Sequence, residues 1–141
     1  MTINTLFLVN FASCLMMTGL IWLIQVVHYP SFHYIASERF KAFENFHAKS
    51  ITFIVFPLML AELVTSILIT LNSVTTFNII NLISVLLLWL MTLIVSMPKH
   101  KRLSNGYDKQ TINSLILTNW PRTIIWSLRS LALSSILLSQ I

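Results

Sequence analysis

Hydrophobic residues dominate four stretches of the chain, at about 6–28, 51–71, 77–97 and 121–141. A bilayer core about 30 Å thick is crossed by ~20 residues of α-helix, and each stretch is long enough to do this. None of the stretches alternates polar and apolar residues as a barrel strand does. The pattern predicts an all-α integral membrane four-helix bundle in which residues 1–141 form a single membrane domain.

Turn-forming residues mark the expected ends of these spans. Pro30 and Pro98 are expected to end the first and third spans, and Pro121 suits the first turn of the fourth. Asp108 is a good N-cap residue for a short helix at 109–118 that precedes the fourth span.

The connection between the first two spans, residues 29–50, is amphipathic. Its apolar residues recur at three- and four-residue spacing: Phe32, Ile35, Phe40, Phe43 and Phe46. The charged residues are expected on the opposite face: Glu38, Lys41, Glu44 and Lys49. This spacing predicts a cytoplasmic amphipathic helix over 37–49 that rests on the membrane interface or continues into the second span.

Composition excludes several classes of protein. Of 141 residues, 56% are hydrophobic and 9% charged, which is too apolar for an ordinary soluble enzyme or a disordered chain. One cysteine cannot form an internal disulfide or a multi-thiolate metal site. The net charge of +5 comes from basic residues interspersed with apolar runs, so we expect no nucleic-acid partner.

The basic residues also predict an orientation. Eight of the nine lysines and arginines lie in or directly beside the connections 29–50 and 98–120. The positive-inside rule therefore predicts a multi-pass protein of the inner (cytoplasmic) membrane, with both connections in the cytoplasm and both termini outside. Membrane lipid is an expected partner, and the sequence leaves open a homo-oligomer or a partner membrane subunit.

Two charged residues, Glu62 and Arg129, lie within the predicted spans. A charge at the centre of a membrane helix costs at least ~2.5 kcal/mol and usually faces the bundle interior. At 1.5 Å per residue, Glu62 and Arg129 reach similar depths, and Gln25 leans toward the same level. We expect these three residues to form one cluster, either as a structural ion pair or as a catalytic site with Glu62 as acid or base.

Further polar and aromatic residues share a helix face with Gln25 in the first span and with Arg129 in the fourth span. They predict a ligand pocket that opens toward the cytoplasm, with Phe40, Phe43 and Phe46 above it. The expected ligand-binding residues are Trp22, His28, Tyr29, His47, Asn119, Arg122 and Trp126. No two histidines have metal-site spacing on one helix, but His28 and His47 would meet if the intervening segment folds back. Two facing histidines are a known haem ligand set, so haem is one candidate cofactor.

Several short motifs carry a resemblance to a known family. They are Trp22 and Gln25 ahead of His28-Tyr29-Pro30, Pro57-x-Met59-Leu60-Ala61-Glu62, Pro98-x-His100-x-x-Leu103 and Asn119-Trp120-x-Arg122-Thr123-x-x-Trp126-x-x-Arg129. With four short spans, they resemble small bacterial membrane proteins that are distantly similar to the anthrone-oxygenase-like family. That family commonly has asparagine where His100 stands. The resemblance implies oxygenation of polycyclic phenolic substrates without an evident cofactor.

Three functions remain open at this point. The first is an oxidoreductase or oxygenase-like enzyme acting on a hydrophobic aromatic or quinone-like molecule, with Arg129 polarising an oxygen and Trp22 and Trp126 stacking on the ring. The second is a non-catalytic accessory bundle that binds lipid or a cofactor such as haem. The third is a transporter or channel, which the lack of charged residues in the outer half of the spans disfavours.

Overall fold

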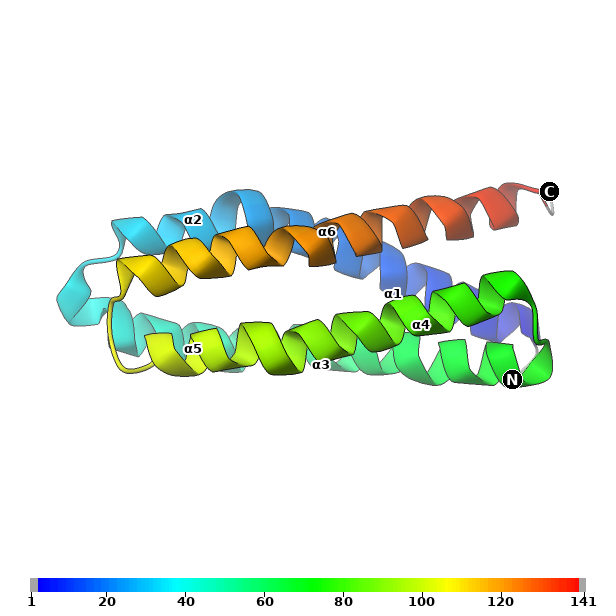
Figure 1. The fold of residues 1–141 in the computed structure, drawn as a ribbon, viewed down its shortest axis with the longest axis horizontal. Helices are drawn as coiled ribbons and strands as arrows, with labels where there is room; N and C mark the ends of the chain where they lie inside the picture. The colour runs from blue at the N-terminus through cyan, green and yellow to red at the C-terminus, as the bar shows by residue number, and fades with distance from the viewer. Residues whose placement is uncertain (1–2, 140–141) are drawn as a thin grey trace.

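Four long helical segments form an elongated bundle in the computed structural model, which describes residues 3–139 (Figure 1). No strand occurs in these residues. The elements, in chain order, are α1 (Ile3–Leu23), the π-helix η1 (Ile24–His28), α2 (Tyr29–Ser31), the 3-10 helix η2 (Phe32–Tyr34), α3 (Ser37–Asn72), α4 (Thr76–Met91), the π-helix η3 (Thr92–Ser96), α5 (Met97–Leu103) and α6 (Lys109–Leu138).

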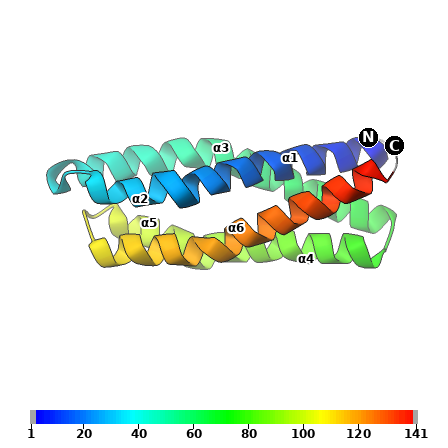
Figure 2. The ribbon, with the colours of Figure 1, turned by 90° about the horizontal axis from the view of Figure 1, so that it is seen from above.

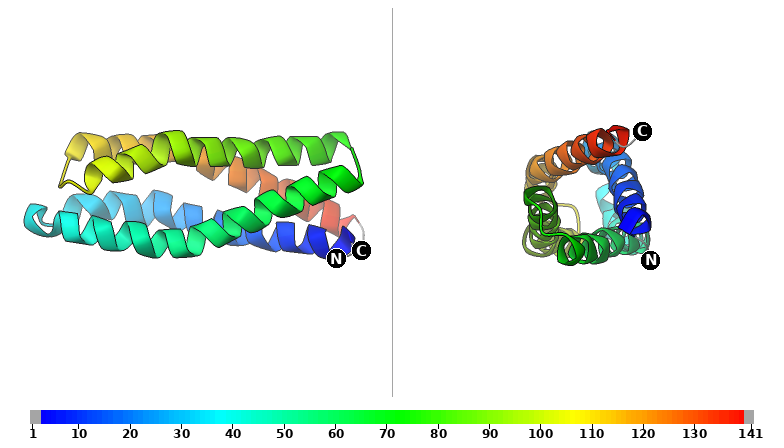
Figure 3. Two further views of the ribbon diagram at one scale, coloured as in Figure 1. Left: turned by 90° about the horizontal axis from the view of Figure 1, so that it is seen from below. Right: turned by 90° about the vertical axis from the view of Figure 1, so that its right-hand side faces the viewer.

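The four segments run up and down, and an end-on view places them at the corners of a square (Figure 3). Seen from above, α6 begins beside α5 and crosses the bundle obliquely toward the end at which α1 begins (Figure 2). We call the end that holds residues 30–41 and 99–109 the basic end, because five exposed cations lie there: Arg39, Lys41, Lys101, Arg102 and Lys109. We call the other end, where α1 begins and α6 finishes, the terminal end.

Neither Pro30 nor Pro98 ends its helix, so that expectation is wrong. The first segment continues to Tyr34 and the third to Leu103. Each proline lies in the first turn of the α-helical piece that follows a π-helical segment, where its missing N–H is tolerated. The wider π turns therefore carry both helices past proline.

The amphipathic segment and the second span form one continuous helix, α3, which settles the alternative between an interfacial helix and a continuation. The face predicted for this segment is only partly correct. Phe40 is buried as expected, but Phe46 is 70% exposed and Glu44 is fully buried. Phe40, Glu44 and His47 follow each other at steps of four and three, so they share the inward face and exclude Phe46 from it.

The expected short helix at 109–118 and the fourth span are likewise one helix, α6, with Pro121 in its interior rather than in its first turn. The last two residues of the expected span, 140–141, lie outside the described residues. Asp108 caps α6 as predicted, because its carboxylate accepts hydrogen bonds from the backbone N–H groups of Gln110 and Thr111. The Thr111 hydroxyl, which also donates to this carboxylate, holds the pKa of Asp108 below its usual value.

Three of the four segments are long and apolar enough to cross a membrane: Asn4–Tyr34, Ser37–Asn72 and Thr76–Leu103. The fourth segment, α6, is equally long but carries more polar residues, so its insertion stays a prediction. The outer surface of the bundle is rich in exposed apolar side chains, among them Phe53, Ile94 and Leu131. Such a surface is expected to contact lipid or another apolar partner.

Candidate functional site

An ion pair between Glu62 and Arg129 lies inside the bundle. Arg129 Nη1 donates to Glu62 Oε1 at 2.6 Å, and the two residues are 5% and 1% exposed. The second carboxylate oxygen, Oε2, accepts a hydrogen bond from the indole Nε1 of Trp126 at 3.0 Å. The structure thus brings together Glu62, Arg129 and Trp126 in the bundle interior.

Two buried asparagines extend this ion pair to the remaining helices. Arg129 Nε donates to Asn81 Oδ1 on α4 at 3.1 Å, and Asn81 Nδ2 donates to Asn10 Oδ1 on α1 and to Ser66 Oγ. Asn10 Nδ2 in turn donates to the backbone carbonyl of Glu62 at 3.1 Å. We call these residues the polar core: Asn10, Glu62, Ser66, Asn81, Trp126 and Arg129.

The polar core ties all four long segments together, since Asn10, Glu62, Asn81 and Arg129 come from α1, α3, α4 and α6. Both carboxylate oxygens of Glu62 are engaged by protein donors. This arrangement favours the structural interpretation of the ion pair, in which the polar core acts as a lock between the four segments. One buried donor in it, Arg129 Nη2, has no partner.

Gln25 does not join the polar core, contrary to the single cluster that its depth predicts. Its Oε1 accepts from Asn119 Nδ2 at 2.9 Å, and its own Nε2 donates to the carbonyl of Ile116 at 3.1 Å. Asn119 Oδ1 accepts from Arg122 Nη1 at 3.0 Å, and the same nitrogen donates to Ser96 Oγ. Gln25 therefore orients Asn119, and Asn119 orients Arg122.

A third group of buried polar residues, the histidine cluster, lies nearer the basic end. It consists of His28, Tyr29, Glu44, His47 and His100. His28 Nε2 and His47 Nδ1 are 2.7 Å apart, so the segment between them folds back as expected. His100 Nδ1 lies 2.6 Å from Glu44 Oε1, and His100 Nε2 lies 3.1 Å from the Tyr29 hydroxyl.

The contacts of His100 define its tautomer. A carboxylate only accepts hydrogen bonds, so Nδ1–H donates to Glu44. In neutral His100 this leaves Nε2 as an acceptor for the O–H of Tyr29. A histidine held by a carboxylate on one nitrogen, with an unprotonated nitrogen facing a hydroxyl on the other side, has the arrangement of a general base.

Haem does not fit between His28 and His47, the two histidines that the sequence analysis proposed as its ligands. Each metal–nitrogen bond needs about 2 Å, whereas the facing nitrogens of His28 and His47 are hydrogen-bonded at 2.7 Å. Within residues 3–139, no group of three or more His, Cys, Asp or Glu side chains is arranged to hold a metal ion.

A cavity of about 300 Å³ lies between the histidine cluster and the polar core. Its wall is mostly apolar and includes Met17, Ile21, Val55, Met59 and Trp89. Four hydrogen-bonding side chains converge on the part toward the basic end: Tyr29, Ser96, His100 and Arg122. Both π-helical segments border this cavity, η1 through Ile24 and η3 through Thr92, Leu93 and Ser96.

The cavity opens sideways rather than toward the basic end, where the sequence analysis placed the opening. Its exposed lining residues are Thr52 and Phe56 on α3, Leu93 on η3 and Met97 on α5. The opening therefore faces the apolar outer surface of the bundle, between α3 and the η3–α5 segment.

Several of the expected ligand-binding residues lie outside this cavity. Trp22 is 43% exposed, donates to Ser127 Oγ and packs edge-on against Trp120, so it belongs to the outer surface. Trp126 is fully buried but faces Glu62 and the guanidinium of Arg122. Of the seven expected ligand-binding residues, Tyr29 and Arg122 line the cavity.

The residues that the sequence analysis missed are His100, Ser96 and Glu44. His100 looked like an interfacial histidine after a terminating proline, and Ser96 like an ordinary small residue near a helix end. The available signal for His100 was its place in the Pro98-x-His100 motif, two residues after a proline that the helix tolerates.

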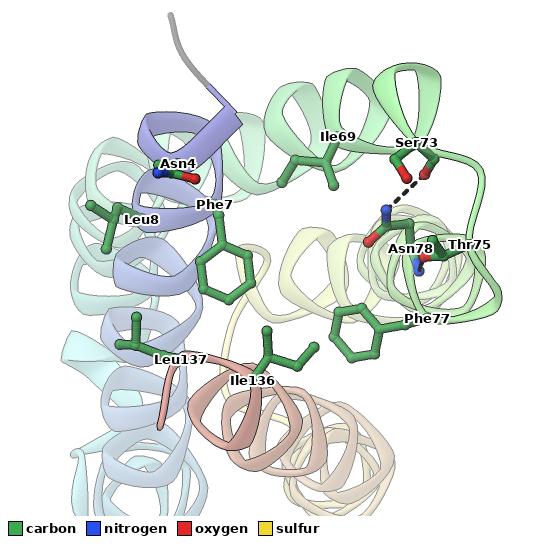
Figure 4. Close-up of a pocket in the computed structure, with 10 residues that line it drawn as sticks. All are labelled: Asn4, Phe7, Leu8, Ile69, Ser73, Thr75, Phe77, Asn78, Ile136 and Leu137. Carbon is green, nitrogen blue, oxygen red and sulfur yellow. Dashed lines mark hydrogen bonds between the residues drawn. The ribbon is translucent and has the colours of Figure 1, made fainter. Parts of the chain in front are cut away.

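A larger cavity, of about 750 Å³, opens at the terminal end between α1, the α3–α4 turn and α6 (Figure 4). The rings of Phe7 and Phe77 project toward it, and Ile136 lies on the α6 side (Figure 4). None of its described lining residues is charged, and Asn78 uses its amide on the carbonyl of Ser73. This cavity offers apolar surface but no acid or base.

Fold and site together define a four-helix bundle with three helices able to cross a membrane, a buried ion-pair network and an internal cavity with one polar end. Comparison of the chain with known protein families, curated proteins and solved structures finds no match.

Proposed function

We propose that the protein is a membrane-embedded enzyme of the oxidoreductase type that binds a hydrophobic aromatic molecule bearing a phenol or quinone oxygen. The observation that carries this proposal is the internal cavity, whose apolar wall ends in Tyr29, Ser96, His100 and Arg122. Small-molecule sites commonly combine an apolar wall with a few convergent polar groups, and about 300 Å³ is at the small end of their range.

The position of the opening supports a ligand that dissolves in lipid. Phe56 and Met97, which flank the opening, are more than half exposed on the outer surface. A molecule in the bilayer would reach the cavity between α3 and α5 without passing through water. The volume of about 300 Å³ favours a ligand of small size.

His100 supplies the chemistry at the polar end. Glu44, fully buried on α3, holds Nδ1 of His100, so Nε2 is ready to receive a proton. A ligand hydroxyl bound beside Tyr29 would pass its proton to the Tyr29 oxygen while Tyr29 passes its own proton to His100 Nε2. The O–H bond of the ligand breaks, an N–H bond forms on His100, and the ligand becomes a phenolate, which is a stronger electron donor than the phenol.

The second candidate function, a non-catalytic binding bundle, is favoured by the polar core. Glu62 and Arg129, the expected catalytic residues, bind each other and do not line the cavity. In that case the bundle would bind the same class of molecule without changing it.

Binding of naphthol to the purified protein in lipid nanodiscs tests the proposal, with quenching of Trp89 fluorescence as the readout. Val55→Phe fills the cavity and should abolish saturable binding. Val64→Phe makes the same change at an exposed position on the same helix and should leave binding intact. Equal binding by the two variants, or no saturable binding by the wild type, contradicts the proposed site.

The absorption spectrum of the bound naphthol tests the role of His100. The wild type should show the longer-wavelength band of naphtholate at neutral pH, and His100→Gln should bind naphthol without that band. His33→Gln is the matched control, because His33 contacts Asn113 and Tyr107 outside the cavity. A naphtholate band that survives in His100→Gln removes the proton-transfer role. Oxygen uptake with bound naphthol then separates the enzyme from the non-catalytic bundle.

A further inference from the structure

Arg122 brings a positive charge into the cavity wall without a carboxylate to balance it. The residue is 5% exposed, and its Nη1 donates to two neutral oxygens, Ser96 Oγ and Asn119 Oδ1, at 3.0 Å each. Its Nε is buried and has no partner. None of the three ion pairs formed within residues 3–139 includes Arg122.

Arg129, two turns further along α6, shows how this bundle accommodates a structural arginine. Its guanidinium lies 2.6 Å from the carboxylate of Glu62, and its Nε donates to Asn81. The same helix therefore buries two arginines to the same extent but provides a counter-charge for only one of them. A buried charge is strongly unfavourable unless it is paired, so the environment of Arg122 is that of a site awaiting an anion.

We propose that the cavity binds its ligand as a monoanion, an aromatic enolate, phenolate or carboxylate, whose oxygen accepts a hydrogen bond from the Arg122 guanidinium. This inference rests on the proposed function, because it assigns the charge of the ligand that the cavity takes. A singly charged ligand would give the Arg122 guanidinium a direct counter-charge, and hydrogen bonds to a charged group are about twice as strong as neutral ones.

The surroundings of Arg122 leave the cavity side as the place for that anion. Trp126 lies 5.3 Å from the guanidinium carbon and does not line the cavity, so its ring covers the side toward the polar core. Glu44, the other buried carboxylate of this region, accepts a hydrogen bond from His100 Nδ1 and does not pair with Arg122. The remaining direction leads into the cavity, where Tyr29 and His100 provide neighbouring hydrogen-bonding groups.

Three probes of similar size test the charge of the ligand: lawsone, a hydroxynaphthoquinone that ionises to an enolate at neutral pH, its uncharged methyl ether, and naphthoate. Wild-type protein in nanodiscs of zwitterionic lipid should bind at least one anion about tenfold or more tightly than the ether. Subtracting the signal of Val55→Phe protein removes partition into the lipid. Tighter binding of lawsone identifies the enolate and phenolate class, and tighter binding of naphthoate identifies the carboxylate class.

Arg122→Gln should lose this preference and still bind the ether, which also shows that the variant is folded. Arg39→Gln removes the same charge from the exposed basic end and should keep the preference. If Arg122→Gln does not fold, Arg122→Lys decides, since it retains the charge and should retain the preference for an anion. Equal binding of all three probes by the wild type overturns the inference while the proposed site stands, whereas no saturable binding by any probe overturns both.

Discussion

Replacing Glu62 with glutamine removes one charge from the polar core and keeps the size of the side chain. In the native structure each carboxylate oxygen accepts one hydrogen bond, from Arg129 Nη1 at 2.6 Å and from Trp126 Nε1 at 3.0 Å. An amide has one oxygen and one nitrogen, so glutamine can accept from one of these donors and turns its own N–H groups toward the other. Arg129 would then remain buried without a counter-charge.

The expected loss in the free energy of unfolding is about 3–5 kcal/mol, the usual cost of leaving one partner of a buried ion pair unpaired. Arg129→Met should cost a similar amount, because Glu62 keeps only the Trp126 donor and Asn81 Oδ1 loses its donor. The double variant removes both charges, and methionine fills much of the volume of the arginine stem. It should therefore recover at least about 1 kcal/mol of the summed single losses.

Unfolding in mixed micelles of an ionic and a non-ionic detergent, followed by far-ultraviolet circular dichroism, measures these differences. Glu38→Gln on the exposed surface of α3 is the matched control and should change stability by less than about 0.5 kcal/mol. If Glu62→Gln is as harmless as Glu38→Gln, or if the two single losses simply add in the double variant, the polar core is not the lock that its geometry indicates.

Two further predictions concern the orientation and the inward face of α3. In a Cys14→Ser background, a membrane-impermeant maleimide should label Ser73→Cys in intact cells and Asn105→Cys only after lysis, and the opposite result would invert the predicted topology. Phe40→Asp should destabilise the bundle by at least about 3 kcal/mol because Phe40 is fully buried, whereas Phe46→Asp at a 70% exposed position should cost far less; similar melting temperatures in detergent would contradict the revised face.

The helical rise explains why the pairing of Glu62 with Arg129 could be predicted from sequence. Once two spans are known to start at the same side of the bundle, residue number fixes depth, and a charge inside an apolar span needs a partner at its own depth. The same reasoning wrongly placed Gln25 in one cluster with Glu62 and Arg129. Depth alone does not give the direction in which a side chain leaves its helix, and the π-helical turn at 24–28 shifts that direction for Gln25.

The histidine cluster was harder to predict, because it depends on the register between helices. The spacing of the phenylalanines in the 37–49 segment favoured a face through Phe40, Phe43 and Phe46, with Glu44 on the opposite, solvent-exposed face. Only the contact with His100, a residue far along the chain on α5, makes burial of the Glu44 carboxylate favourable. A single sequence does not specify that α3 and α5 meet at these two residues.

The distribution of unpaired buried atoms separates the structural part of the molecule from its functional part. Four buried side-chain atoms of the described residues lack a partner, and three of them, Arg122 Nε, Glu44 Oε2 and His47 Nε2, belong to the half toward the basic end. The polar core leaves only Arg129 Nη2 without a partner. An unpaired buried polar atom costs about 1–3 kcal/mol. Of the three residues toward the basic end, Arg122 is the one that lines the cavity, so it is at Arg122 that a bound ligand can supply a missing partner.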